Sequence, residues 1–254
     1  MKNTLRSLAA PLGISVAAAF FCVGPARAQR YVKWLVGPEG GYNFVIYRSD
    51  AFPILNELPH SFLAQNGTGN GYFWGLSGEY PLDTNMRHFL ILEAGFDSKP
   101  GTFSNLSPSS GSTIVVEHNG QNSDTMVIVT SVSLWTKLSY YYVNLGYKYN
   151  LRADSIPNGL GIQLCLSIGF KNEADFWKSV SVTPQTSTNA SSITTAQSLR
   201  LALRPELTYD LPLTHAWVLT PFAGYEFPLT KVDPSENWWA SALYGGLALR
   251  YAIW

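Results

Sequence analysis

Few residues in this sequence have the types and the spacing that catalysis needs. The segment EHNGQNS (117–123) places His118 and Ser123 close together. A serine nucleophile needs a base within hydrogen-bond reach and a third group that orients the base, and this spacing does not supply that arrangement. A glycine-containing hairpin tip explains the segment more simply, so we expect no catalytic site.

Candidate metal ligands are equally isolated. Cys165 is the only cysteine after residue 28, and no metal-ligand spacing connects the four histidines, which are His60, His88, His118 and His215. Structural metal sites bring several such ligands together at short, regular spacings. We therefore expect neither a metal site nor another cofactor, and no disulfide within the chain after residue 28.

The more numerous chemical groups are charges placed between apolar residues. In SLRLALRPELTY (198–209) leucine returns at every second position, a period that indicates a β-strand with one apolar face and one charged face. Parity along the other segments puts four carboxylates and four cations on a shared side: Glu79, Glu93, Glu206 and Glu226 with Lys148, Arg200, Arg204 and Arg250. If that side is the lumen of a narrow barrel, the charges must pair, because an isolated buried ion is very costly.

Eight alternating segments would position these charges: 39–47, 71–82, 88–97, 133–149, 158–171, 197–209, 216–227 and 239–253. The connections between them alternate between short and long, with short ones at 83–87, 150–157 and 210–215. An even strand count with this alternation is typical of barrels of the outer membrane. The long third connection contains TIVVEH (113–118) and TMVIVTSV (125–132), which we interpret as a hairpin beyond the membrane. Ten strands would result if both segments crossed it.

The apolar faces favour lipid over a soluble core. Aromatic residues, which prefer membrane–water interfaces, collect near the ends of the segments: Tyr72, Trp74, Tyr80, Tyr147, Tyr149, Trp217, Tyr225, Phe227, Trp238 and Tyr251. Charged residues make up 13% of the chain, against about 25% in soluble proteins. No run after residue 29 is apolar for long enough to form a transmembrane helix. The leucines are therefore expected to face lipid and the arginines to fill the lumen.

The first residues resemble a secretory signal. Lys2 and Arg6 precede an apolar run, and Ala26-Arg27-Ala28 has the small residues of a cleavage site. We expect a signal peptide at 1–28 and a single barrel domain at 29–254. The chain carries 17 basic and 17 acidic residues, so no basic excess suggests nucleic-acid binding.

Five segments resemble the small outer-membrane β-barrel proteins of the OmpA/OmpX-like group: GGYNF (40–44), WGLSGEYPL (74–82), LEAGF (92–96), LRPELTY (203–209) and GLALRYAIW (246–254). The resemblance implies an all-β, closed, antiparallel up-and-down barrel of eight strands in the outer membrane. It also implies insertion by the barrel-assembly machinery with periplasmic chaperones, and surroundings of outer-membrane lipid and lipopolysaccharide.

The expected function is a non-enzymatic role in envelope integrity or surface contacts, with a filled, salt-bridged lumen. Three alternatives stay open: a narrow gated pore for small solutes, a lipid-modifying outer-membrane enzyme, and a soluble lipocalin-like binder. Pro205 and Pro221 fall inside expected strands, where each removes a ladder hydrogen bond, so we also expect β-bulges there.

Overall fold

The computed structural model describes eight stretches of the chain, all within a compact unit that starts at Val32: 32–48, 66–103, 113–115, 126–152, 156–183, 186–192, 196–234 and 237–254. The predicted signal peptide at 1–28 and the segment 117–123 lie outside these residues. No helix in the described stretches is long and apolar enough to cross a membrane.

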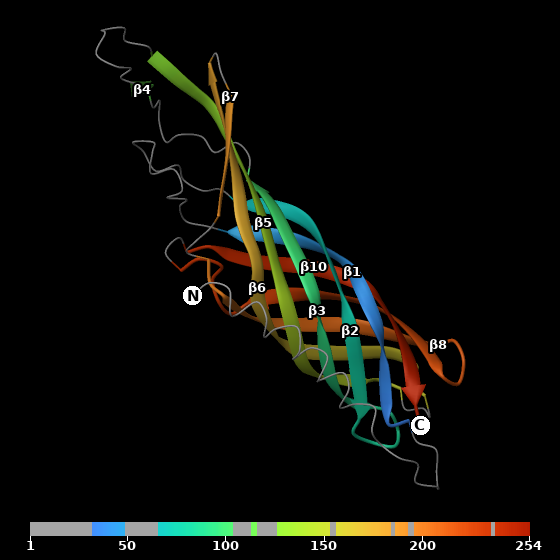
Figure 1. The fold of residues 1–254 in the computed structure, drawn as a ribbon. Coiled ribbons are helices and arrows are strands. Elements are labelled where there is room, and N and C mark those ends of the chain that lie inside the picture. Colours follow the sequence, from blue (N-terminus) through green and yellow to red (C-terminus); the bar gives the residue numbers. More distant parts are fainter. Residues whose placement is uncertain are drawn as a thin grey trace, which may run out of the picture. The chain divides into compact units, whose positions relative to one another are not determined.

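The described chain consists of antiparallel strands (Figure 1). In chain order they are β1 (Trp34–Arg48), β2 (Gly67–Pro81), β3 (His88–Phe103), β4 (Thr113–Val115), β5 (Met126–Asn150), β6 (Gly159–Thr183), β7 (Thr186–Ser192), β8 (Leu199–Pro212), β9 (Trp217–Pro228) and β10 (Trp239–Ile253).

Eight of these strands close into a barrel. Each pairs with its neighbour in the order β1-β2-β3-β5-β6-β8-β9-β10, and β10 returns to pair with β1. The other two are short additions, because β4 pairs only with 126–128 of β5 and β7 only with 175–181 of β6. The predicted eight-stranded barrel is confirmed, and the ten-stranded alternative is not.

Strand β6 continues well past the segment 158–171 predicted for it, and β5 begins before 133–149. The start of β5 lies in TMVIVTSV (125–132), where residues 126–128 pair with β4, as the predicted hairpin requires. Both have 25 residues and pair with each other from Asn150–Gly161 to Ile128–Thr183. An exposed ion pair between Lys137 and Glu173 lies on their outer face, with 2.9 Å between Nζ and Oε1. Beyond the bilayer a strand needs no apolar outer face, so pairing continues after the period-two signal has faded.

The short connections lie together at one end of the barrel, as predicted. Two are held by side chains that accept backbone hydrogen bonds. Asp83 accepts from the backbone N–H groups of Arg87 and His88, both at 2.9 Å, and Thr214 accepts from those of Ala216 and Trp217. We call this the turn end of the barrel and the opposite end the loop end.

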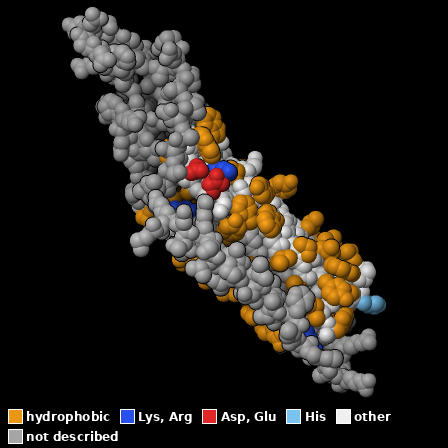
Figure 2. Space-filling view, in the orientation of Figure 1, with side chains coloured by type: hydrophobic (Ala, Val, Ile, Leu, Met, Phe, Trp, Pro, Cys, Tyr) orange, Lys and Arg blue, Asp and Glu red, His pale blue; other side chains and the backbone are white. Residues whose placement is uncertain are grey.

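The two faces of the wall differ as the alternation predicted. Along β8 the inward residues are buried, whereas Leu199, Leu203 and Leu207 are exposed on the outside. Figure 2 shows apolar side chains over much of the visible barrel wall. Only helices and closed barrels satisfy every backbone hydrogen bond within a bilayer, and a closed barrel with an apolar outer face is the outer-membrane type. The chain is thus an outer-membrane β-barrel, and the soluble alternative is not supported.

Most of the aromatic residues predicted for the interfaces lie on this outer face. Seven are exposed: Tyr72, Trp74, Tyr80, Tyr147, Trp217, Phe227 and Tyr251. Tyr149 and Tyr225 are half-buried. Trp238 is a correction, because it is only 1% exposed and its ring lies 5.7 Å from that of Tyr47 inside the barrel. Outward positions in β10 are odd-numbered, so Trp239 has the outward parity assigned to Trp238.

The bulges predicted at Pro205 and Pro221 are absent. The β8–β9 register is the same on both sides of each proline. Instead, the ladder lacks pairs between Leu203–Phe227 and Glu206–Gly224, and again between Thr208–Phe222 and Leu211–Leu219. Both prolines therefore coincide with missing residue pairs between β8 and β9, but neither strand gains the extra residue that defines a β-bulge. The register shifts occur in the β5–β6 pair, at Val129/Ser131 and Ser139/Tyr140.

Close packing inside the barrel leads to a first prediction, at Gly41. A Cβ atom there would lie 2.1 Å from the carbonyl oxygen of Gly245 and 2.8 Å from the Phe73 ring. Because backbone cannot move aside cheaply, Gly41→Ala should destabilise the barrel by about 1–3 kcal/mol in urea unfolding in lipid vesicles. The control is Gly78→Ala, whose Cβ would come no closer than 3.6 Å to another atom. Equal stability of the two variants would contradict this packing.

A charged lumen as the candidate functional site

The lumen contains all eight charged residues that parity placed there, and each is at most 5% exposed. Four further charged residues are buried with them: Glu39, Asp97, Lys99 and Asp210. These were missed because Lys99 and Asp210 lie just past the ends of predicted segments, and Glu39 and Asp97 are the terminal residues of theirs. Extending the same parity by one or two residues would have found Lys99 and Asp210, and applying it to the terminal residues would have found Glu39 and Asp97.

At the turn end, a single lysine holds two carboxylates. The Nζ of Lys148 lies 3.0 Å from Glu79 and 2.8 Å from Asp210. Arg250 binds Glu79 from another strand at 2.9 Å, and Thr220 donates its hydroxyl to Asp210 at 2.8 Å. These contacts join β2, β5, β8, β9 and β10, so side chains link strands across the barrel at this end of the lumen.

At the loop end, a second group of charges mirrors the first. Lys99 lies 2.8 Å from Asp97 and 3.3 Å from Glu226, and Arg200 pairs with Glu226 as well. Beyond this level, the Trp238 ring packs at 6.1 Å from that of Phe103. Charged pairs covered by aromatic rings leave little free space across the lumen here.

Between these levels, Arg204 lies among aromatic rings. Its guanidinium carbon is 4.1 Å from the centroid of the Tyr244 ring, 5.7 Å from that of Tyr142 and 5.8 Å from that of Phe73. Tyr142 in turn donates its hydroxyl to Glu39 at 2.9 Å. A desolvated cation on an aromatic face gains about 2 kcal/mol of interaction free energy, so these rings stabilise the Arg204 side chain inside the lumen.

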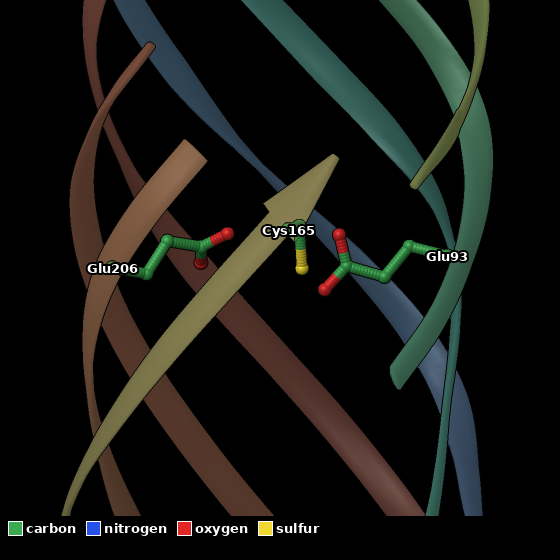
Figure 3. Close-up of side chains that lie close together, drawn as sticks. All are labelled: Glu93, Cys165 and Glu206. Carbon is green, nitrogen blue, oxygen red and sulfur yellow. The ribbon is translucent and has the colours of Figure 1, made fainter. Parts of the chain in front are cut away.

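Three acceptor groups converge at this middle level. Glu93 and Glu206 point toward each other with Cys165 between them (Figure 3), and their ligand atoms lie within 4.8 Å of one another. The amide nitrogen of Gln163 lies 3.0 Å from Glu93, 3.3 Å from Glu206 and 3.3 Å from the Cys165 sulfur. The two N–H groups of this amide are shared among the three acceptors.

The predicted balance of four carboxylates and four cations needs correction. The described strands bury seven carboxylates and five cations. The carboxylates with mostly neutral partners are at the middle level, where Tyr142, Asn144 and Gln163 donate to Glu39 and Glu93. Glu39 and Glu93 are therefore held by neutral hydrogen-bond donors.

Solved structures of outer-membrane proteins match the chain at low identity. Ail, the attachment invasion locus protein of Yersinia pestis, solved with the heparin analogue sucrose octasulfate, is 10% identical over 86% of this chain and 99% of its own, with a TM-score of 0.36. Neisserial surface protein A is 14% identical over 87% of this chain and 97% of its own, with a TM-score of 0.35. The outer membrane protease OmpT from Escherichia coli is 7% identical over 90% of this chain and 99% of its own, with a TM-score of 0.38.

No family model matches the sequence, and no curated protein matches it. The fold of this chain therefore follows from its own strand pairing and from the two faces of its wall.

Proposed function

We propose that this chain is a non-enzymatic structural protein of the outer membrane, whose lumen is a salt-bridged plug and whose loops make surface contacts. The observation that carries the proposal is the stack of paired side chains through the lumen. Charges pair at the turn end and the loop end, and Arg204 packs against three aromatic rings between them.

The plug accounts for a barrel that stabilises the membrane without perforating it. An eight-stranded barrel is just wide enough for its own side chains to fill. Here the side chains that fill the lumen come from strands on opposite sides of the barrel, as in the contacts of Lys148 to Glu79 on β2 and Asp210 on β8. Such cross-links make the wall rigid, which suits an envelope protein that carries exposed loops.

Two measurements test this proposal. On semi-native gels the unboiled protein from isolated outer membranes should migrate faster than the boiled protein, as a closed, detergent-stable barrel does. A protein found in the soluble periplasmic fraction without such a shift would overturn the outer-membrane assignment.

In planar bilayers, the folded protein should give no steady conductance at neutral pH, because an eight-stranded barrel is just wide enough for its side chains to fill and the charges here are paired. The heat shift of the same preparation serves as the control that folded barrel was added. Reproducible current steps would instead support the narrow gated pore.

A further inference from the structure

A groove of about 530 Å³ opens on the outer wall at the loop end of the barrel. We call it the wall groove. It is lined by Ile46, Arg48, Tyr225, Phe227, Pro228, Trp239 and Ser241.

The groove exists because two neighbouring strands separate. The β9–β10 ladder stops at Glu226–Ala242, whereas β10 continues to pair with β1 as far as Arg48–Trp239. All of its lining side chains except that of Pro228 have the outward parity of β1, β9 and β10. The wall groove therefore opens to the bilayer and not to the lumen.

Two cations mark this groove. Arg48 is exposed in its lining, and the Nζ of Lys231 lies 5.7 Å from the centroid of the Trp239 ring. Among the residues that the structure describes, no carboxylate lines the groove and neither cation has a carboxylate partner. A groove lined by one cation, aromatic rings and a serine, with a second cation next to one of those rings, is complementary to a phosphate group.

An apolar surface continues from the wall groove toward the turn end. A second hollow, of about 470 Å³, includes Phe44, Leu243 and Ala223 in its lining. Phe44 pairs with Leu243 two positions along the same ladder from Ile46 and Ser241. The cations at the loop end are thus followed, deeper in the bilayer, by a surface that suits an acyl chain.

We propose that the wall groove binds an outer-leaflet lipid that carries a phosphate group. Arg48 and Lys231 contact the phosphate, Trp239 and Phe227 flank the head group, and an acyl chain lies along Phe44 and Leu243. The inference rests on the proposed outer-membrane location, because only there does the loop end meet phosphorylated glycolipid.

The test uses the purified full chain in detergent, mixed with lipid A that carries two phosphates. Native mass spectrometry then measures how much lipid the protein retains. The double variant Arg48→Gln/Lys231→Gln should bind lipid A about thirtyfold more weakly, because each of the two basic residues near an anionic lipid contributes on the order of 1 kcal/mol. Dephosphorylated lipid A should be retained by the native protein as weakly as lipid A is by the variant.

The matched control is Arg87→Gln/Lys137→Gln, which removes two cations outside the groove and should retain lipid A as the native protein does. Equal losses in the two double variants would mean general charge attraction and would overturn the proposal, as would equal retention of dephosphorylated lipid A. Displacement of lipid A by millimolar inorganic phosphate would reveal a free-anion site instead, and would also reject the proposal. The heat shift of each protein is recorded in parallel. Its absence in the native chain would refute the barrel itself, whereas a normal shift without lipid preference would refute only the groove.

Discussion

Lys148→Met will destabilise the folded barrel by about 3–5 kcal/mol, the usual cost of removing one partner from a buried ion pair. Lys148 is fully buried and contacts both Glu79 and Asp210. Its loss leaves Arg250 as the remaining cation against Glu79, and it leaves Asp210 with neutral donors only. Methionine keeps the length of the side chain, so the charge is the main change.

The measurement is urea unfolding of the protein in lipid vesicles, followed by the unboiled gel band. The same strand offers a matched control, Lys137→Met, because Lys137 pairs with Glu173 on the exposed outer face. Exposed pairs contribute little, so this control should unfold like the native chain. Similar midpoints for the two variants would contradict the role of Lys148.

A second variant keeps the prediction testable if Lys148→Met does not fold at all. Lys148→Met/Asp210→Asn removes one opposite charge together with the lysine. The remaining Glu79–Arg250 pair is then balanced, so this double variant should recover part of the folded fraction. No recovery would show that lost packing, and not unpaired charge, causes the defect.

Arg204→Leu should also cost about 3–5 kcal/mol, and it should leave the bilayer current at zero. Arg204 is the cation that packs against the rings of Tyr244, Tyr142 and Phe73 at the middle level. Without it, Glu206 and Glu93 face each other with neutral hydrogen-bond donors, among them the Gln163 amide. Repulsion between these carboxylates is the physical reason for the loss.

The control for this variant is Arg87→Leu at the exposed turn after β2, which should change neither stability nor conductance. Adding Glu206→Gln to Arg204→Leu removes one of the two facing carboxylates and should restore part of the lost stability. A structural plug predicts lost stability without current in planar bilayers. If Arg204→Leu stays stable and conducts, the arginine is a gate, and the proposed plug is wrong.

The sequence predicted the wall of the barrel well, because lipid on one side and a polar lumen on the other impose a strict period of two. In β8 the alternation of leucine with Arg200, Arg204 and Glu206 matches the observed burial residue by residue. Where that constraint ends, prediction became less accurate. Strand β6 continues to Thr183, past the predicted end at residue 171. A register shift near this point reverses the parity of the strand, because the buried residues are odd-numbered before it (Cys165, Ser167) and even-numbered after it (Ala174, Phe176).

The errors at the site have the same origin. Asp210 was assigned to a turn and Lys99 to a loop, because aspartate, proline and serine nearby are typical of connections. In the structure both side chains still point into the lumen and form ion pairs. Trp238 was placed at the interface by residue type, although its even number gives it the inward parity of β10. Parity was the better guide in each case.

The two prolines of the β8–β9 seam affect how the barrel would come apart. Hydrogen bonds join each strand to its neighbours, and this seam lacks them at two separate places, while the adjoining β6–β8 and β9–β10 ladders are unbroken through Pro205 and Pro221. Proline has no N–H group, so the gaps place fewer unpaired donors against hydrocarbon than other residues would. Local opening starts where backbone hydrogen bonds are fewest. Among the eight strands of the barrel this seam has the fewest paired residues, so we expect the wall to part sideways into the bilayer here first.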